Sequence, residues 1–368
     1  METDTKRILI AGQFPPPVHG FSYITQQMEK LLSKQYDTKI IDLVPHTKRG
    51  SVVYHLRRLW LVVKGCVAIA NYALRARNFK KIYIGCESRM GLIYTILISL
   101  TARISGLSIY IHYHNFNFID NYSLLMDLFL KILSKNTVHI FLCPLMGKQL
   151  AERYKKELKS IVISNSAFVA DSGTTVKTLK PSETITIGLL SNLNEEKGLS
   201  IFLDTLRKAI QNELNVKAVL AGPPVSDKDH KTIEQAKSEF GDKLDYRGAV
   251  YNEEKTQFFR DIDVFLFPTC YANEAQPTVI AESLSFGVPV LSYQRGCIRD
   301  KVGSCGDVFD NAEDFAAKAL SRLKEMINDV DSLNDLKQAS QKAFIRDKSK
   351  ALETAKNIFS TKLTVFGS

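Results

Sequence analysis

Residues 264–292 read VFLFPTCYANEAQPTVIAESLSFGVPVLS, and this stretch decides the fold that the sequence predicts. It opens with a short apolar run of strand type, crosses a polar loop and enters a helical pattern at Pro277, which we expect at the first helical position. A second strand-type run follows Gly287 and ends at Ser292. A strand, a helix and a second strand in this order predict a βαβ unit within a parallel sheet.

Two carboxylates bracket the start of the expected helix. Glu274 lies on the loop before Pro277, and Glu282 lies inside the helix, beyond its first turn. The first amides of a helix have no intrahelical partner, and the helix dipole adds partial positive charge to them. We therefore expect an anion site here, suited to phosphate. Glu282 would accept hydrogen bonds from hydroxyls such as those of a ribose, and Glu274 would face the group attached to the phosphate.

The same alternation of strand and helix patterns extends in both directions along the chain. A polar stretch at residues 167–183 interrupts it and predicts a linker between two doubly wound α/β domains, at about 1–170 and 171–345. Residues 314–363 form a helical pattern. The strand-type runs are residues 7–14, 38–44, 81–85, 108–114 and 138–143 in the first half, and 184–191, 216–221, 264–267 and 288–292 in the second.

Positive charge is concentrated in the first half of the 368-residue chain, whose net charge is +10. Residues 1–160 carry 23 Lys and Arg against 10 Asp and Glu, whereas the remainder carries 26 against 29. Residues 49–81 contain no acid and read as a basic amphipathic helix, which predicts contact with an anionic membrane. The asymmetry alone also fits nucleic acid, and a solvated face with an ordinary core stripe is a third interpretation. The residues concerned are Arg57, Arg58, Lys64, Arg75, Arg77 and Lys80, with Leu56, Leu59, Trp60, Val63, Val67 and Ile69.

Several common site types have no signature in the sequence. The chain contains neither a G-x-G-x-x-G nor a G-x-x-x-x-G-K-[ST] motif, which argues against a dehydrogenase and a P-loop enzyme. The six cysteines form no C-x-x-C pair, so no zinc site is indicated. The D-x-D triplets at 261–263 and 329–331 are expected to be structural or solvent-facing. Residues 91–107 are short and contain Arg103, so we expect a buried helix there and no membrane span. The first residues do not read as a signal peptide.

The pair Glu274 and Glu282 forms an E-x7-E motif that resembles glycosyltransferase family 4, the retaining GT-B enzymes that include bacterial lipid-glycan mannosyltransferases. The resemblance covers nearly the whole chain. It implies two Rossmann-like domains facing across a deep cleft, with a C-terminal helix at about 346–368 that packs back on the first domain. It also implies transfer of a hexosyl unit from a UDP- or GDP-sugar to an acceptor hydroxyl, without a metal or other cofactor.

The resemblance assigns individual residues. It implies that Glu274 and His114 contact the transferred sugar, and that Glu282 binds the ribose. Asn192 stands where the family usually has an arginine. Either another cation, such as Arg247, Arg295 or Arg299, supplies the missing charge, or the diphosphate is bound more by backbone amides. The full donor-binding set implied is His19, Gly20, Asn192, Lys197, Gly222, Arg247, Gly248, Gln276, Pro277, Thr278, Val279 and Glu282.

The expected acceptor is a lipid-linked glycan or oligosaccharide of a bacterial surface polysaccharide, such as O-antigen, capsule or exopolysaccharide. Such an enzyme would act in the cytoplasm, on the inner face of the cytoplasmic membrane, and would not bind nucleic acid. Two alternatives remain open: a sugar phosphorylase or epimerase of the same fold, and a non-enzymatic basic scaffold that binds membranes or nucleic acid. The sequence does not identify the sugar or the linkage.

Overall fold

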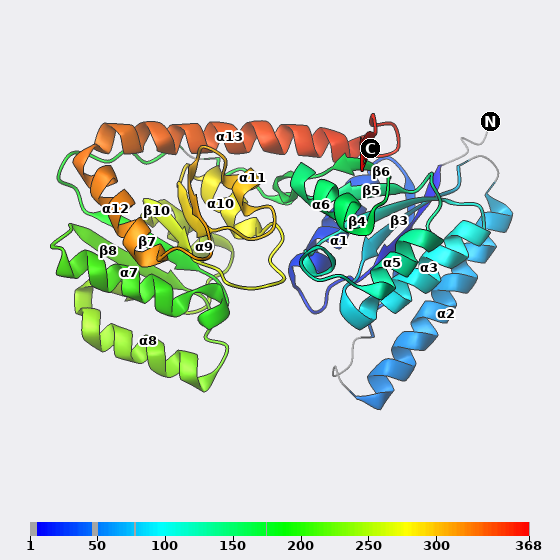
Figure 1. Ribbon diagram of the computed structural model, residues 1–368, viewed down its shortest axis with the longest axis horizontal. Coiled ribbons are helices and arrows are strands. Elements are labelled where there is room, and N and C mark those ends of the chain that lie inside the picture. Colours follow the sequence, from blue (N-terminus) through cyan, green and yellow to red (C-terminus); the bar gives the residue numbers. More distant parts are fainter. Residues whose placement is uncertain (1–5, 46–50, 77–78, 174, 368) are drawn as a thin grey trace. The chain divides into compact units, whose positions relative to one another are not determined.

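The computed structural model describes residues 6–45, 51–76, 79–173 and 175–367. The chain forms two compact units, one made of Met1–Phe168 with Lys350–Ser368 and the other of Val169–Ser349 (Figure 1). Each unit is a mostly or fully parallel sheet with helices packed on it, so the expected α/β class with two Rossmann-like domains is confirmed.

The first unit is built on a sheet of order β13-β6-β5-β4-β3-β1-β2, in which every pair is parallel except the antiparallel pair of β13 and β6. The order changes direction between β1 and β3, which makes the carboxyl ends of these two strands the switch point where doubly wound sheets bind ligands. The strands are β1 (Arg7–Gly12), β2 (Asp37–Asp42), β3 (Lys81–Cys86), β4 (Ser108–Tyr113), β5 (Val138–Phe141), β6 (Leu158–Val162) and β13 (Thr364–Phe366).

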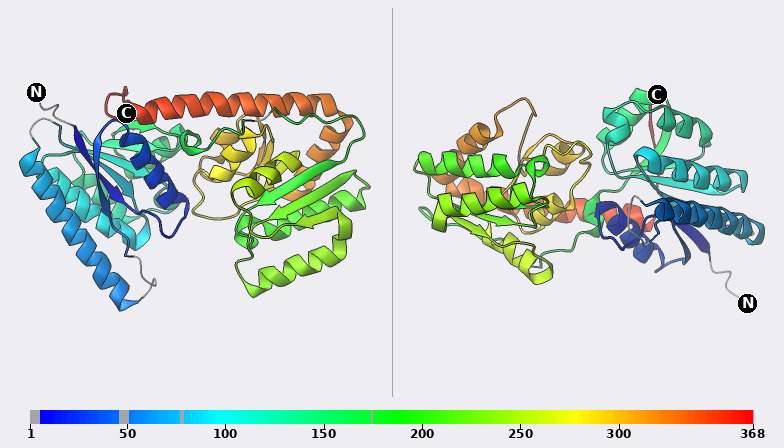
Figure 2. Two further views of the ribbon diagram at one scale, coloured as in Figure 1. Left: turned by 180° about the vertical axis from the view of Figure 1, so that it is seen from behind. Right: turned by 90° about the horizontal axis from the view of Figure 1, so that it is seen from below.

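Alternate residues of each strand in the first unit face opposite sides of the sheet. Ile8 and Ile10 of β1 join a buried cluster that includes Met28 of helix α1 (Gly20–Leu32) and Ala351 near the end of helix α13 (Val330–Lys356). Helices α2 and α3 pack against each other and against strands of this sheet (Figure 2). The helices are α1 (Gly20–Leu32), α2 (Val52–Arg75), α3 (Leu92–Ile104), α4 (Asn117–Asp120), α5 (Leu124–Ile132) and α6 (Pro144–Tyr154), with short 3-10 turns η1 (Arg89–Gly91) and η2 (Asn165–Phe168).

The second unit has a fully parallel sheet of order β12-β11-β10-β7-β8-β9. Counted within the unit, this is the order 3-2-1-4-5-6 of dinucleotide-binding folds, with its switch point between β7 and β10. The strands are β7 (Ile185–Leu190), β8 (Val216–Ala221), β9 (Leu244–Tyr246), β10 (Val264–Phe267), β11 (Val290–Tyr293) and β12 (Gly306–Phe309).

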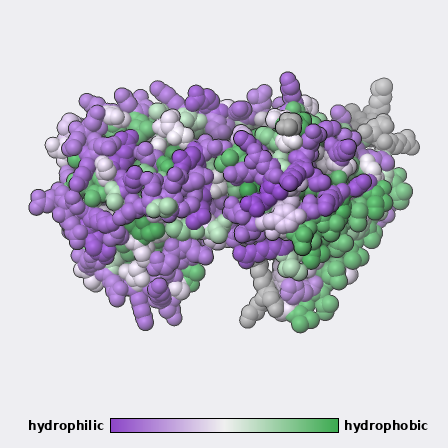
Figure 3. Space-filling model, in the orientation of Figure 1, coloured by the Kyte–Doolittle hydropathy of each residue, from purple (hydrophilic) through white to green (hydrophobic). Residues whose placement is uncertain are grey.

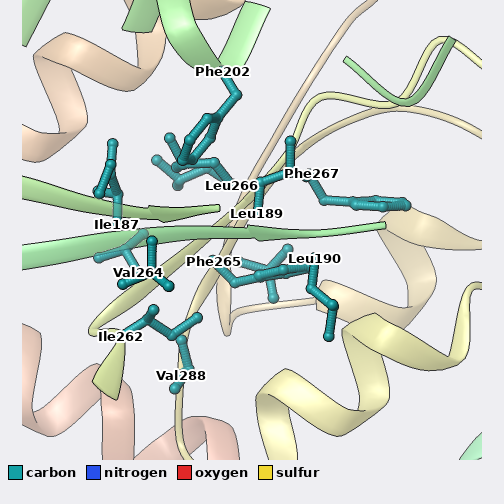
Figure 4. Close-up of a cluster of buried hydrophobic side chains, with 14 of the residues drawn as sticks. Ile187, Leu189, Leu190, Phe202, Ile262, Val264, Phe265, Leu266, Phe267 and Val288 are labelled. Carbon is teal, nitrogen blue, oxygen red and sulfur yellow. The ribbon is translucent and has the colours of Figure 1, made fainter. Parts of the chain in front are cut away.

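The core of the second unit lies on both faces of its central strands (Figure 4). Successive residues Val264, Phe265, Leu266 and Phe267 of β10 are all buried, as expected for a parallel strand covered on both sides. The helices are η3 (Glu195–Lys197), α7 (Leu199–Gln211), α8 (Asp227–Phe240), η4 (Gly241–Lys243), α9 (Asn252–Asp261), α10 (Thr278–Ser285), α11 (Ile298–Val302), α12 (Phe315–Asn328) and α13 (Val330–Lys356).

Three details of the sequence prediction are wrong. Pro277 is the N-cap of α10, not its first helical residue. The helical tail ends at Lys356, not at residue 363, and β13 follows it on the sheet edge of the first unit. Arg58 does not belong to an exposed basic face, because it is buried against the Glu87 carboxylate and lies over the Tyr94 ring at 4.3 Å.

The other basic residues predicted for the amphipathic helix within residues 49–81 lie in different places. Arg57, Lys64 and Arg75 of α2 are exposed, whereas Arg49 and Arg77 lie outside the described residues. Within the described residues, no helix is long and apolar enough to cross a membrane.

Candidate functional site

Two loops meet at the switch point of the second sheet. One follows β7 and contains η3, and the other follows β10 and carries Glu274. The Cys270 amide donates a hydrogen bond to the Glu196 carbonyl at 2.8 Å, which ties the two loops together. Parallel strands present their carboxyl ends at one edge, so this position is where the fold itself predicts a ligand.

Lys197 and Glu274 form an ion pair at this edge. The ammonium lies 2.5 Å from a Glu274 carboxylate oxygen and 4.4 Å from the centroid of the Tyr271 ring. The Thr269 hydroxyl donates to the same carboxylate oxygen at 3.4 Å. The side chains are only 21% and 10% exposed, so the pair lies in a partly desolvated site where its charges are weakly screened.

The turn that holds Lys197 is specified locally. The Asn194 side chain accepts a hydrogen bond from the Lys197 amide at 2.8 Å, which caps η3. Gly198 follows with φ of 83°, and a Cβ there would lie 2.3 Å from the Pro268 carbonyl oxygen. A glycine is therefore required both for the backbone conformation and for the close approach of the β10 loop.

Helix α10 begins directly after the Glu274 loop. Pro277 occupies the N-cap position without a side-chain hydrogen bond, and the amides of Thr278 and Val279 belong to the first turn, where a helix has no carbonyl to offer them. Gln276, just before the cap, is buried. The N-terminal end of α10 thus supplies amide donors next to the loop of the Lys197–Glu274 pair.

Glu282 lies one turn further along α10 and has a different partner from Glu274. Its carboxylate is 2.6 Å from the Lys255 ammonium of α9, and its side chain is 22% exposed. The structure therefore keeps the two glutamates of the motif chemically separate, each with its own lysine.

The ends of β8 and β9 contribute two glycines. The Gly222 amide donates to the Gly248 carbonyl at 2.6 Å, and both residues have positive φ, 123° and 64°. A Cβ on Gly222 would lie 1.7 Å from the Ser191 carbonyl oxygen, so only glycine fits. These turns bring the backbone of β8 against the β7 loop that also carries the exposed Asn192.

The three arginines considered as substitutes for the missing charge at Asn192 differ in their contacts. Arg247 lies between Asp245 at 2.8 Å and Asp261 at 2.7 Å. Arg299 pairs with Asp310 at 2.7 Å. The Nε atom of Arg295, in contrast, is buried and has no hydrogen-bond partner among the described residues.

Arg295 also lies on the right loop for this role. Its neighbour Gly296 packs so closely that a Cβ would meet the Glu274 and Ala275 carbonyl oxygens at 2.5 Å. The Cys297 amide donates to the Ala275 carbonyl at 2.7 Å. The Arg295 loop is therefore fastened to the backbone of the Glu274 loop.

The candidate residues of the first unit form a separate cluster, near the end of β1 and the end of β4. His19 is the N-cap of α1, because its Nδ1 accepts from the Ser22 amide at 3.3 Å and its own amide donates to the Ser22 hydroxyl at 3.0 Å. Within the described parts of the chain, a Cβ on the exposed Gly20 would meet no atom of a more distant residue within 4 Å. Packing in the unit therefore does not require this glycine.

His114 is packed inside this cluster. Its ring centroid lies 4.1 Å from that of His112 and 4.9 Å from that of Phe21, and the Tyr83 hydroxyl lies 2.6 Å from His112 Nδ1. Burial lowers the pKa of His114 to about 3 and the pKa of His112 well below its usual range. His114 is consequently a neutral imidazole at physiological pH and cannot act as a cationic acid.

Sequence analysis missed a polar group at the switch point of the first sheet. Glu87 follows β3, is buried, and receives a hydrogen bond from the Gln13 amide group at 2.7 Å besides its contact with Arg58. Their position in the sequence could have predicted this group, because Gln13 and Glu87 are the first polar side chains after β1 and β3.

Metal ligation has no obvious location in the described part of the chain, where no group of three or more His, Cys, Asp or Glu side chains converges. Asp263, from the first D-x-D triplet, is fully buried and accepts from Lys337 and Lys177, each at 2.9 Å. Asp261 of the same triplet binds Arg247. The first triplet therefore serves the packing of the second unit.

Comparison with known proteins agrees with this geometry. Residues 184–325, within the second unit, match the family model of glycosyl transferases group 1. No curated protein sequence matches the chain.

Solved structures resemble the whole chain at low identity. HepE from Anabaena, in complex with UDP, has 15% identity and a TM-score of 0.69 over 96% of this chain and 99% of its own. A HepE structure with UDP-glucose has a TM-score of 0.65. Sucrose-phosphate synthase from Thermosynechococcus elongatus has 14% identity and a TM-score of 0.67, covering 96% and 98%. The lipopolysaccharide outer core galactosyltransferase WaaB has 12% identity and a TM-score of 0.65, covering 95% and 99%. The chain therefore has the GT-B fold.

Proposed function

We propose that this protein, which has the GT-B fold and carries the group 1 glycosyltransferase pattern in its second unit, transfers a hexosyl unit from a nucleoside diphosphate sugar to an acceptor hydroxyl with retention of configuration. The observation that carries the proposal is the Lys197–Glu274 pair, held at the switch point of the second sheet and leading into the N-terminus of α10. UDP-hexoses are the donors to test first, because the similar HepE structures hold UDP and UDP-glucose. Assignment to family 4 stays a prediction.

The diphosphate would be bound by cations and amides together. An ammonium has three N–H donors, so Lys197 can keep its contact with Glu274 and still donate to a phosphate oxygen. The amides of Thr278 and Val279 add donors at the positive end of the α10 dipole. We assign the charge missing at Asn192 to Arg295, whose loop is fastened to the Glu274 loop and whose Nε atom has no hydrogen-bond partner among the described residues. On this arrangement no metal is needed to neutralise the leaving group.

The two glutamates would act on opposite ends of the donor. Glu282 would accept from the ribose hydroxyls, and Glu274 would stabilise positive charge that develops on the sugar in an oxocarbenium-like transition state. In the proposed step, the bond from the anomeric carbon to the diphosphate oxygen breaks and the acceptor oxygen forms a bond on the same face. The acceptor proton passes to the departing diphosphate. The neutral His114 would contribute a hydrogen bond to the sugar.

The acceptor would be a lipid-linked glycan or an oligosaccharide of a bacterial surface polysaccharide, reached at the inner face of the cytoplasmic membrane. Two observations support this part of the proposal. The basic excess in residues 1–160 suits an anionic surface. WaaB, one of the similar structures, is a lipopolysaccharide galactosyltransferase.

The test combines binding, rate and product. UDP and UDP-hexoses should raise the melting temperature of the wild type, and one of them should give a glycosylated product whose anomeric configuration, read by NMR, equals that of the donor. Glu274→Gln should bind UDP with nearly unchanged Kd and turn over about a hundredfold more slowly. Glu239→Gln is the matched control, because Glu239 also pairs with a cation of the second unit, Arg207, but lies on the exposed surface of α8.

Specific results would contradict the proposal. No binding of UDP or GDP would favour a non-enzymatic scaffold. Phosphorolysis in place of transfer would favour the phosphorylase alternative. Equal rates for Glu274→Gln and Glu239→Gln would remove Glu274 from the reaction.

A further inference from the structure

Helix α2 is apolar on two opposite faces. Its inner face buries Tyr54, Val62 and Ile69 in the first unit. Its outer face exposes Leu56 by 63% and Trp60 by 56%. A surface helix ordinarily has one apolar stripe and a polar opposite face, so the folding of this unit does not account for the outer stripe.

The exposed apolar residues continue from α2 onto η1 and α3. Helices α2 and α3 pack side by side, and Figure 3 shows hydrophobic residues gathered along this part of the first unit. Contiguous apolar patches on a soluble domain mark a surface that something else covers. We define the outer apolar face as Val52, Val53, Leu56, Leu59, Trp60, Val63, Val67 and Leu74 of α2 with Met90 of η1 and Ile93, Leu97, Leu100 and Ile104 of α3.

The charged side chains of α2 and α3 are all basic. Arg57, Lys64 and Arg75 are exposed and lie along one edge of α2, because their separations of seven and eleven residues are close to two and three helical turns. The Lys64 ammonium lies 3.5 Å from the centroid of the Trp60 ring. Neither α2 nor α3 contains an acidic residue. An apolar stripe with a cationic edge complements a surface that has acyl chains beneath anionic headgroups.

A second copy of the chain fits this surface less well. A twofold contact brings the same patch of both subunits together, so Arg57 and Lys64 would approach their own counterparts. The first 160 residues already carry 23 basic against 10 acidic side chains, and such a contact would add to this repulsion. Anionic lipid headgroups instead neutralise the edge.

We propose that the outer apolar face lies on an anionic bilayer and inserts its side chains into the boundary between headgroups and acyl chains. The contact is therefore mainly hydrophobic, with the basic edge adding affinity for anionic lipid. Arg58, which the sequence places among the membrane-facing cations, is internal and takes no part. The membrane contact itself is argued from α2 and α3. Only its role, to bring the enzyme to a lipid-linked acceptor, rests on the proposed function.

Trp60 makes the surface directly observable, because it is the only tryptophan in the chain. Vesicles of phosphatidylcholine with phosphatidylglycerol should shift its emission to the blue, and lipids brominated near the headgroup should quench it. Insertion predicts that the shift persists at 0.5 M salt, where purely electrostatic adsorption is largely screened. No shift, or a shift that salt abolishes completely, would overturn the proposal.

Flotation with matched variants supplies the second readout. Leu56→Gln with Val63→Gln should lower the vesicle partition coefficient at least tenfold at both low and high salt. Val225→Gln with Ile345→Gln is the matched control, because these residues are 58% and 50% exposed in the second unit, and it should float as the wild type does. Arg57→Gln with Lys64→Gln should weaken binding to anionic vesicles roughly fivefold per residue at low salt and leave binding to neutral vesicles unchanged.

Three outcomes would refute the contact: a wild type that does not float, an apolar variant that floats equally well, or a dimer in sedimentation that the apolar variant abolishes. The last would identify a second copy as the occupant. The rise in melting temperature that UDP causes should be equal in the wild type and all these variants. If UDP does not bind to the wild type, this result counts against the proposed function, whereas flotation still tests the membrane surface.

Discussion

Replacing Lys197 by Met separates the two tasks that the structure gives this lysine. It removes the cation that lies 2.5 Å from Glu274. Among the described residues, that carboxylate, 10% exposed, then keeps only the Thr269 hydroxyl at 3.4 Å. Removing one partner of a fully buried pair costs about 3–5 kcal/mol, and the partial exposure of both side chains reduces this to roughly 2 kcal/mol. If Lys197 also binds the diphosphate, the variant loses a charge-assisted contact of about 1.5–3 kcal/mol, which raises the Kd for UDP on the order of ten- to a hundredfold.

The double variant Lys197→Met with Glu274→Gln tests this division. It leaves no unpaired charge in the site, so the free energy of unfolding in urea should recover most of the loss. The affinity for UDP, measured by calorimetry, should not recover, because the cation is still missing. If Lys197→Met binds UDP as tightly as the wild type, Lys197 is only a counter-ion for Glu274. If the double variant recovers affinity, the single variant acted by distorting the loop.

Four other changes have expected outcomes. Glu282→Ala should raise the Kd for UDP about tenfold, by removing the acceptor for the ribose hydroxyls, while Glu239→Ala should leave it unchanged in the same calorimetric titration. Arg295→Met should weaken UDP binding by about 1.5–3 kcal/mol and Arg299→Met by much less, since Asp310 already neutralises Arg299; equal effects would contradict the assignment. Burial lowers the pKa of His112, His114 and His139, so the unfolded state binds more protons below about pH 6.5. Stability should then be level above pH 7 and fall by up to about 1.4 kcal/mol per pH unit for each histidine between pH 6.5 and 5, and a constant urea midpoint over that range would refute it. Gly222→Ala should destabilise the protein by about 3 kcal/mol or more in thermal unfolding, because its Cβ would lie 1.7 Å from the Ser191 carbonyl oxygen, whereas Gly241→Ala, where a Cβ meets nothing, should cost less.

The sequence predicted the local features of the second unit well. The run from β10 through the loop to α10 and β11 has its own signals in strand propensity, in Pro277 and in Gly287, and these depend on neighbours in the chain. The amide donors at the start of α10 could be inferred, because the first turn of a helix provides them whatever surrounds it. The one-residue error at Pro277 is within the one or two residues by which helix boundaries commonly vary.

Contacts between distant segments could not be predicted in the same way. Lys197 and Glu274 are 77 residues apart, and only the strand order of the sheet brings their loops together. Helix α2 has apolar residues on two faces, and its sequence does not say which one meets the sheet, so Arg58 was assigned to the wrong side. The burial of His112 and His114 likewise depends on Tyr83 and Phe21, which come from other elements.

The shared helix α13 has a consequence for how the protein is made. The first unit consists of Met1–Phe168 and Lys350–Ser368, so Ala351, Ala355 and Ile358 of its core leave the ribosome after the entire second unit. At synthesis rates of about 5–20 residues per second, roughly 10–40 s pass between these two parts. During that time the apolar face that includes Met28 and Tyr83, which these residues later cover, stays exposed to solvent. The nascent first unit should therefore be a client for chaperones, and it should resist protease on stalled ribosomes only once residues near 358 have emerged.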